Sequence, residues 1–275
     1  MKRFIILSLI FISCLSIQSN AQGNLLITPM RVVFEDAKQI QELNLVNTGI
    51  DTTTFTISFI QYNMKEDGTM VKTDNPDEVQ MPAAPYLRIY PTKVTLAPGE
   101  PQVIVLQLRR KSGMPTGEYR SHLYFRAEKE NILHGFNKTE QDTTQLTVHL
   151  IPVYGLSIPV IIRTNDVNVN TTLTDLELES PPESSPLIKF TINRTGNIST
   201  YGNIIVENRP QQGKPIQLAV VKGIGIYADL SKRKIEIKLN NSPGIPFKKG
   251  KIKVSYVSND ESKKPVVYAE GELDI

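Results

Sequence analysis

The stretch KVTLAPGEPQVIVLQLR, residues 93–109, decides the fold class of this chain. Apolar residues alternate with other residues on both sides of a turn that contains Pro98 and Gly99. This alternation is typical of half-buried strands, and proline and glycine between two such runs indicate a turn. The stretch therefore predicts two strands joined by a tight connection.

Similar runs recur along the chain with turn residues between them. They are rich in Val, Ile, Thr, Tyr and Phe: RVVF (31–34), QELNLVNTG (41–49), TFTISFIQY (54–62), YLRIYP (86–91) and GEYRSHLYFRAE (117–128). Short strands at such spacing predict a β-sandwich or barrel. No helical period of apolar residues is found after the N-terminal segment, and 18 prolines argue against long helices. We expect an all-β protein.

Three pairs of segments echo one another in the same order. ELNLVNTG (42–49) is similar to KFTINRTGN (189–197), VTLAPGEPQVIVLQL (94–108) to IYADLSKRKIEIKL (226–239), and GEYRSHLYF to KGKIKVSYV. They predict two related sandwich domains with a boundary near residues 163–166. The alternative is that any two antiparallel sandwiches share such strands. We expect the polar segments 63–85 and 128–144 to be long surface loops.

The N-terminus predicts export. Lys2 and Arg3 precede an apolar run that ends near Ile17, and Ala21 closes a stretch of small residues, as in a secretory signal peptide of residues 1–21. A second reading makes Cys14 a lipidated cysteine. No apolar segment of 18 residues follows, so we expect no membrane span. Because Cys14 is the only cysteine, the mature chain would have no disulfide, and burial must hold the fold.

Composition and motifs give little support to catalysis or to nucleic-acid binding. His122, His134 and His149 have no metal-binding spacing, and no nucleophile elbow, phosphate-binding loop or paired-cysteine motif occurs. Basic residues are interspersed with acidic ones, and the formal net charge is only +3. We expect a protein that is not an enzyme, uses no cofactor, metal or small-molecule substrate, and binds no nucleic acid.

Residues 145–163, QLTVHLIPVYGLSIPVIIR, alternate for longer than one ordinary strand of about 5–6 residues needs. One face of this extended segment would carry Leu146, Val148, Leu150, Tyr154, Leu156, Ile158 and Val160. An apolar face of this length packs either on the protein's own core or on another molecule.

Four blocks of the first half resemble the N-terminal domain of the periplasmic pilus chaperones, the PapD-like family of the chaperone-usher pathway. They are TPMRVVFED (28–36), LNLVNTG (43–49), YLRIYPTKVTLAPGEPQVIVLQL (86–108), and GEYRSHLYFRAE followed by the strand QLTVHLIPVYGLSIPV. The resemblance implies immunoglobulin-like sandwiches in tandem, an N-terminal chaperone domain at 22–162 and a C-terminal domain at 163–275.

The resemblance also implies a function in the periplasm. A chaperone of this family donates an edge strand to a pilus or other surface-fibre subunit that lacks its final strand, and Leu146, Val148 and Leu150 match the inserted residues. Arg31 matches one of two basic residues that bind the subunit's C-terminal carboxylate. The second, a lysine, is not matched, and its position falls at or beside Tyr154. An outer-membrane usher is a further partner that the resemblance suggests. The alternative is an adhesive or structural surface protein with the same fold.

Overall fold

The computed structural model describes residues 25–35, 38–74, 81–111, 113–128, 155–164, 166–181, 183–240, 247–259 and 264–275. The expectations for the signal peptide, Cys14, Leu146, Val148, Leu150 and Tyr154 lie outside these residues.

Strands β1 to β10 form the first sandwich. One sheet has the order β1-β3-β8-β6, with β1 Leu25–Thr28, β3 Ile40–Asn47, β8 Pro101–Leu108 and β6 Leu87–Tyr90. The other has the order β2-β10-β9-β4-β5, with β2 Val32–Phe34, β10 Gly155–Arg163, β9 Glu118–Ala127, β4 Thr53–Met64 and β5 Met70–Thr73. β7, Lys93–Leu96, pairs with β4, and a 3-10 helix, Ala84–Tyr86, precedes β6.

The remaining strands form the second sandwich. Its sheets have the orders β11-β12-β15 and β14-β13-β16-β17. The strands are β11 Val169–Glu179, β12 Leu187–Gly196, β13 Thr200–Pro210, β14 Ile216–Ile226, β15 Lys232–Lys238, β16 Gly250–Ser258 and β17 Val267–Asp274.

Both sandwiches have immunoglobulin-like strand orders. In that fold one sheet contains strands A, B, E and D and the other contains C, F and G. The order β1-β3-β8-β6 corresponds to A-B-E-D, and β10-β9-β4 corresponds to G-F-C. In the second sandwich, β11-β12-β15 corresponds to A-B-E, and β17-β16-β13 to G-F-C. The predicted all-β architecture with two immunoglobulin-like sandwiches in tandem is confirmed.

Each sandwich has its own hydrophobic core. Fully buried residues of the first include Phe34, Leu43, Ile104, Leu123 and Val160. The second core is built in the same way around Ile192, Ile204, Val254 and Tyr256. The inward residues recur at every second position of their strands, as the alternation in the sequence predicts. No helix among the described residues is long and apolar enough to cross a membrane.

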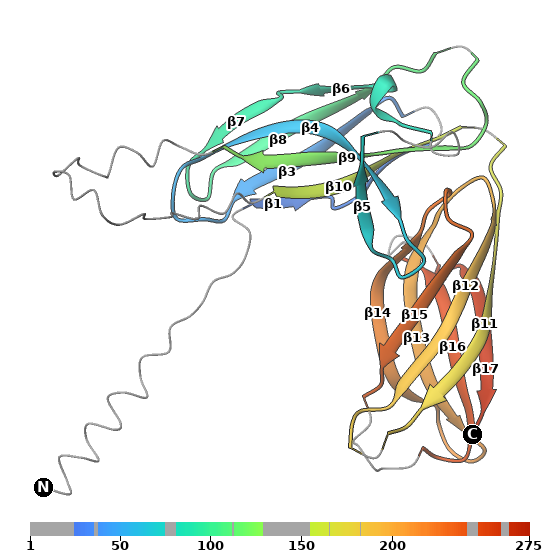
Figure 1. Ribbon diagram of the computed structural model, residues 1–275. Helices are drawn as coiled ribbons and strands as arrows, with labels where there is room; N and C mark the ends of the chain where they lie inside the picture. Colours follow the sequence, from blue (N-terminus) through green and yellow to red (C-terminus); the bar gives the residue numbers. More distant parts are fainter. Residues whose placement is uncertain are drawn as a thin grey trace, which may run out of the picture.

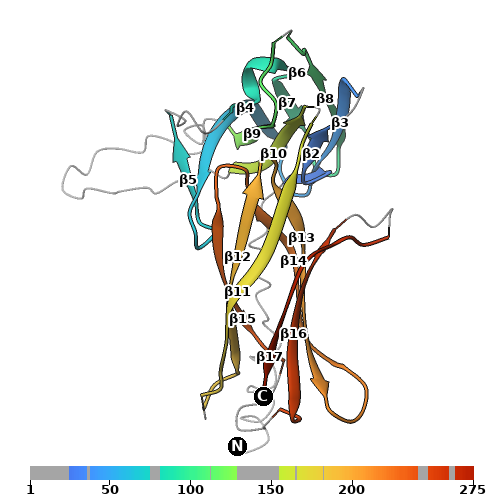
Figure 2. The same cartoon turned by 90° about the vertical axis from the view of Figure 1, so that its right-hand side faces the viewer.

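The two sandwiches are set at an angle to one another, so that the molecule is bent like the letter L (Figure 1). The hairpin formed by β4 and β5 reaches from the first sandwich toward the end of the second (Figure 2). This hairpin corrects one expectation, because part of the segment 63–85 is not a loop. Residues 63–74 continue β4, turn, and form β5. The segment is polar because a two-stranded projection is exposed on most sides.

The three echoing segments occupy equivalent places in the two sandwiches. β3 and β12 each lie between a first strand and the partner strand, β8 or β15, that contains the second echo. β9 and β16 each lie inside the other sheet. The likeness between the two halves is therefore a likeness of topology.

Candidate functional site

A polar face of β9 forms the floor of the cleft between the sandwiches. Tyr119, Leu123 and Phe125 point into the first core, so Glu118, Arg120 and His122 point the other way. A polar strand face normally meets water, yet all three of these residues are buried. The second sandwich covers them.

Glu118 joins the two sandwiches through one carboxylate oxygen. Its Oε2 accepts hydrogen bonds from the backbone N of Ser199 at 3.0 Å, from Ser199 Oγ at 2.8 Å, and from Arg163 Nε at 3.0 Å. Arg163 also donates to Ser199 O and pairs with Glu35 at 2.6 Å. Burial by itself would lower the pKa of Arg163, but Glu118 and Glu35 raise it overall. These charges are compensated inside the junction.

Arg120 makes the second connection. Its Nη2 lies 2.9 Å from Asp229 Oδ2 in the second sandwich and donates to Tyr62 O at 2.8 Å. Its guanidinium lies 3.8 Å from the centroid of the Tyr227 ring. Ion pairing, hydrogen bonding and a cation–π contact thus act on one buried side chain.

The loops that carry Asp229 and Ser199 are held by Arg194 of β12. This buried guanidinium donates to four backbone carbonyls, those of Gly196, Ile198, Ala228 and Leu230, at 2.7–3.1 Å. Burial lowers the pKa of Arg194, whereas Glu118 and Asp229 act in the opposite direction. Arg194 therefore fixes the second sandwich's side of the junction.

Arg31 lies in the bend between β1 and β2, at the edge of this junction. Its Nη2 donates to Ser199 Oγ at 3.2 Å, and its guanidinium lies 4.7 Å from the centroid of Tyr201 and 6.0 Å from that of Tyr227. Among the described residues no carboxylate lies within ion-pair distance of Arg31. Arg120 and Arg163 each have a carboxylate partner, whereas Arg31 has none among the described residues. The half-buried guanidinium of Arg31 can therefore bind an anion.

His122 lies next to the arginines and is uncharged. Burial lowers its pKa to about 3, and the nearby positive charges of Arg120 and Arg31 add to this effect. The ring contacts Tyr62 at 5.0 Å and Tyr227 at 6.1 Å between centroids, edge to face. The cleft thus combines aromatic surface with positive charge, and the described residues include no group of ligands for a metal ion.

β10 has an open edge beside Arg31. All nine residues of β10 pair with β9, but on the other side only Val160–Ile162 pair with β2, in parallel. Among the described residues no strand pairs with that side of Gly155–Pro159. In the β2 register Val32 lies opposite Val160, so Arg31 stands where the open edge begins. The segment 145–154 leads directly into this edge.

Of the sequence-derived site residues, only Arg31 lies in the described part of the chain, and it faces the cleft. Sequence reasoning missed Glu118, Arg120, Arg163, Ser199 and Asp229 as junction residues. A usable signal was the spacing of Glu118, Arg120 and His122, which places a charged stripe on a single face of a strand.

No protein-family model matches this chain, and no curated protein sequence matches it. Several solved structures that are similar to this chain are described as chaperones or as complexes of a chaperone. The CsuC–CsuE chaperone–tip adhesion subunit complex of Acinetobacter baumannii is similar at 12% identity, over 90% of this chain and 99% of that chain, with a TM-score of 0.46. The Salmonella enterica SafB chaperone–SafA pilin structure shows 14% identity over 92% and 97%, with a TM-score of 0.42. The Pseudomonas aeruginosa CupB2 chaperone shows 11% identity over 91% and 100%, also at 0.42.

Proposed function

We propose that this protein is a periplasmic chaperone that binds pilus or other surface-fibre subunits by pairing a strand of its own with an incomplete subunit sandwich. The observation that carries the proposal is the open edge of β10, which begins beside Arg31. An unpaired edge is a template for strand addition, and in this proposal the segment before β10 would extend that edge.

The register of β2 supports a parallel direction for the added strand. β2 runs parallel to β10 and starts at Val32, immediately after Arg31. A subunit strand could occupy the open edge of β10 and end where β2 begins. If this subunit strand runs parallel to β10, as β2 does, its C-terminal carboxylate lies at the Arg31 guanidinium. The proposal therefore includes a parallel subunit strand with its last residue in the cleft. An arginine suits this end, because its planar fork binds both oxygens of a carboxylate.

The apolar residues of the donated strand supply the affinity in this proposal. Leu156, Ile158 and Val160 of β10 face the first core. The period of two continues this face to Leu146, Val148 and Leu150, which would fill the open core of the subunit. Each buried side chain contributes about 1.5–3 kcal/mol before the cost of association. We place the chaperone domain at residues 22–162, the second domain at 163–275 and the signal peptide at 1–21.

The test is co-purification of the mature protein from periplasmic extracts, with mass spectrometry of the bound proteins. We expect fibre subunits to accompany the wild type and to be lost from a Leu146→Asp, Val148→Asp, Leu150→Asp variant. The matched control carries three aspartates at exposed apolar residues of other strands, Leu26, Val103 and Ile216, and should retain the subunits. Circular dichroism checks the fold of both variants. Subunits that stay bound to the first variant, or unfolding of that variant alone, would favour the adhesive or structural alternative.

Arg31 is tested in the same assay. Arg31→Ala removes the positive charge that is proposed to bind the subunit's carboxylate, so we expect at least a tenfold smaller yield of bound subunit. Arg31→Lys keeps a positive charge and should recover part of the yield. Equal yields from wild type and Arg31→Ala would remove the carboxylate contact from the proposal.

A further inference from the structure

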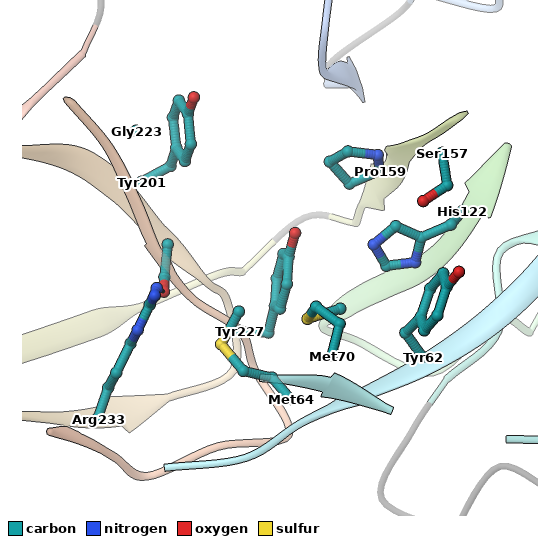
Figure 3. A pocket seen from close by; sticks show the side chains of 11 residues that line it. Tyr62, Met64, Met70, His122, Ser157, Pro159, Tyr201, Gly223, Tyr227 and Arg233 are labelled. Atoms are coloured by element: carbon teal, nitrogen blue, oxygen red, sulfur yellow. Dashed lines mark hydrogen bonds between the residues drawn. The ribbon is translucent and has the colours of Figure 1, made fainter. Parts of the chain in front are cut away.

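Pro159 is the last residue of the open edge of β10. Val160 is the first residue of β10 that pairs with β2, and no described strand pairs with the same side of Gly155–Pro159. The side chains of Ser157 and Pro159 line a cavity of about 420 Å³ between the sandwiches (Figure 3). The edge at Pro159 therefore borders open space on the side of the cleft.

Hydrogen bonds along β9 show which residues of β10 direct their main-chain groups toward the open edge. In an antiparallel pair, residues that bond the partner strand alternate with residues that face away from it. Arg120 of β9 faces away from β10, because its N–H donates to Met81 O at 2.8 Å. Gly117, just before β9, faces the other way, since its carbonyl accepts from Thr164 N, just after β10, at 3.1 Å. The odd-numbered residues of β9 therefore bond β10, and the even-numbered residues do not.

This alternation places the main-chain groups of Gly155, Ser157 and Pro159 on the open edge. Each of the three lies opposite an even-numbered residue of β9, and Pro159 lies opposite His122. Gly155 and Ser157 each offer a donor and an acceptor to an added strand. Pro159 offers only its carbonyl, because its nitrogen has no hydrogen. Ser157 is therefore the last residue of the open edge that can donate a hydrogen bond.

A strand added parallel to β10 meets this missing donor at a defined place. In a parallel pair the strand residue that donates to Ser157 O turns its own carbonyl toward the nitrogen of Pro159. A peptide carbonyl there finds no donor, and an unmade hydrogen bond costs free energy. A terminal carboxylate can instead turn to Arg31, which directly precedes Val32, the partner of Val160.

We propose that Pro159 is a positioning residue that determines where the subunit strand ends. In this register the N–H of the strand's last residue donates to Ser157 O, and its carboxylate lies beside Pro159, where Arg31 binds it. The inference rests on the proposed chaperone function and adds a register and a selection to it. Arg31 attracts the carboxylate, whereas the missing donor at Pro159 disfavours a chain that continues past this point. The edge thus selects a free C-terminus over an internal segment.

Disulfide formation in the periplasm tests the register. Cys14 is the only cysteine of the chain, so a cysteine can be placed at one chosen residue of the mature protein. Ser157→Cys is co-expressed with the co-purified subunit that carries a cysteine at its second-to-last residue, which this register sets opposite residue 157. Neighbouring strands lie about 4.8 Å apart, which is within the range of a disulfide. We expect a cross-linked complex.

Three control positions in the subunit check this result. Cysteines at the last and third-to-last residues point to the other face of the sheet, and one at the fourth-to-last residue lies two positions away on the same face. All three should cross-link at least tenfold less, because a disulfide tolerates little displacement. A cross-link that is strongest at any control position would overturn the proposed register.

Pro159→Ala tests the selection, because it restores an N–H at the open edge. The probe is the same subunit with one alanine added to its C-terminus, which places a peptide carbonyl beside residue 159. For the wild type we expect at least a tenfold smaller yield of the extended subunit than of the natural one, and for Pro159→Ala a difference of about threefold or less. Pro98→Ala gains an N–H in the exposed turn before β8 and should discriminate as the wild type does.

Each protein is judged by the ratio of its two yields, so a general loss of stability does not mimic the result. Equal discrimination by the wild type and Pro159→Ala, while natural subunits still co-purify, would refute this inference alone. The absence of any co-purified subunit would refute the chaperone function itself, and this inference with it.

Discussion

His122 remains neutral in the folded protein, and this links stability to pH. The pKa of about 3 lies below the ordinary value of 6.5, so below pH 6.5 the unfolded chain binds a proton that the folded chain does not. The folded state therefore loses stability as the pH falls from 6.5 toward 3, by about 1.4 kcal/mol per unit.

For His122→Gln we predict a flatter stability profile. Between pH 7 and pH 5 the wild type should lose about 2 kcal/mol more unfolding free energy than the variant, measured by urea denaturation with tyrosine fluorescence. The chain has no tryptophan to interfere. Identical profiles for the two proteins would mean that His122 is charged, or partnered, in the folded state.

The buried pair of Arg120 and Asp229 should be more important for stability than a surface pair. Arg120→Met leaves Asp229 without its cation in a mostly buried site, and we expect a loss of about 3 kcal/mol in unfolding free energy. Arg209→Met makes the same change in the exposed pair with Glu207 and should cost about 0.5 kcal/mol or less. Urea denaturation measures both, and similar losses would show that Arg120 does not join the sandwiches as described.

At the residue scale, the sequence singled out Arg31, whose role stays a prediction, but it did not indicate the surroundings of Arg31. The block TPMRVVF marked Arg31 through a family resemblance. Glu118, Arg120 and His122 alternate with core residues, a pattern that is typical of a solvent-exposed face. Their burial depends on residues about 80–110 positions away in a separate sandwich, such as Ser199 and Asp229, and no local pattern encodes that packing.

At the element scale, the β4–β5 hairpin acts as a clasp between the sandwiches. Glu66 O accepts a hydrogen bond from Lys234 N at 2.7 Å, and Glu66 pairs with Lys234 Nζ at 3.3 Å. Gly68 lies against the Arg233 guanidinium, so closely that a Cβ atom there would overlap it. Gly68 also has φ of +84°, where residues other than glycine are strained.

For this clasp we predict a difference between two glycine substitutions. Gly68→Ala should strain the turn and also displace Arg233, so it should lower the unfolding temperature and enlarge the radius of gyration. Gly99→Ala meets a similar backbone strain at φ +75° but no neighbouring atom, so it should lower the unfolding temperature less and leave the radius unchanged. Small-angle scattering and thermal denaturation give both quantities. An unchanged radius in Gly68→Ala would contradict the role of the hairpin as a clasp.

Elements were predictable where apolar alternation and turn residues agree. The stretch 93–109 became β7 and β8, with the turn at Gly99. β5 was missed because Met70–Thr73 is a four-residue edge strand with no buried residue, so it has no apolar periodicity. Its pairing with β4, and the contact of the preceding turn with the second sandwich, are tertiary features.

At the scale of the whole molecule, the two sandwiches have the same topology but different surroundings. The inner strands β9 and β16 occupy equivalent places, yet only β9 has a charged face that the other sandwich buries. The same junction also positions Arg31 beside the open edge of β10. The bent arrangement of the sandwiches therefore forms the cleft, and Arg31 lies at the edge of the junction that closes it.

Hydrogen–deuterium exchange of the free protein and of its complex with a co-purified subunit tests strand addition most directly. We expect the amides of residues 145–158 to become protected in the complex, and those of the edge strand β6, Leu87–Tyr90, in the opposite sheet to exchange as before. Protection confined to β6 or to the second sandwich, with residues 145–158 unchanged, would contradict strand addition.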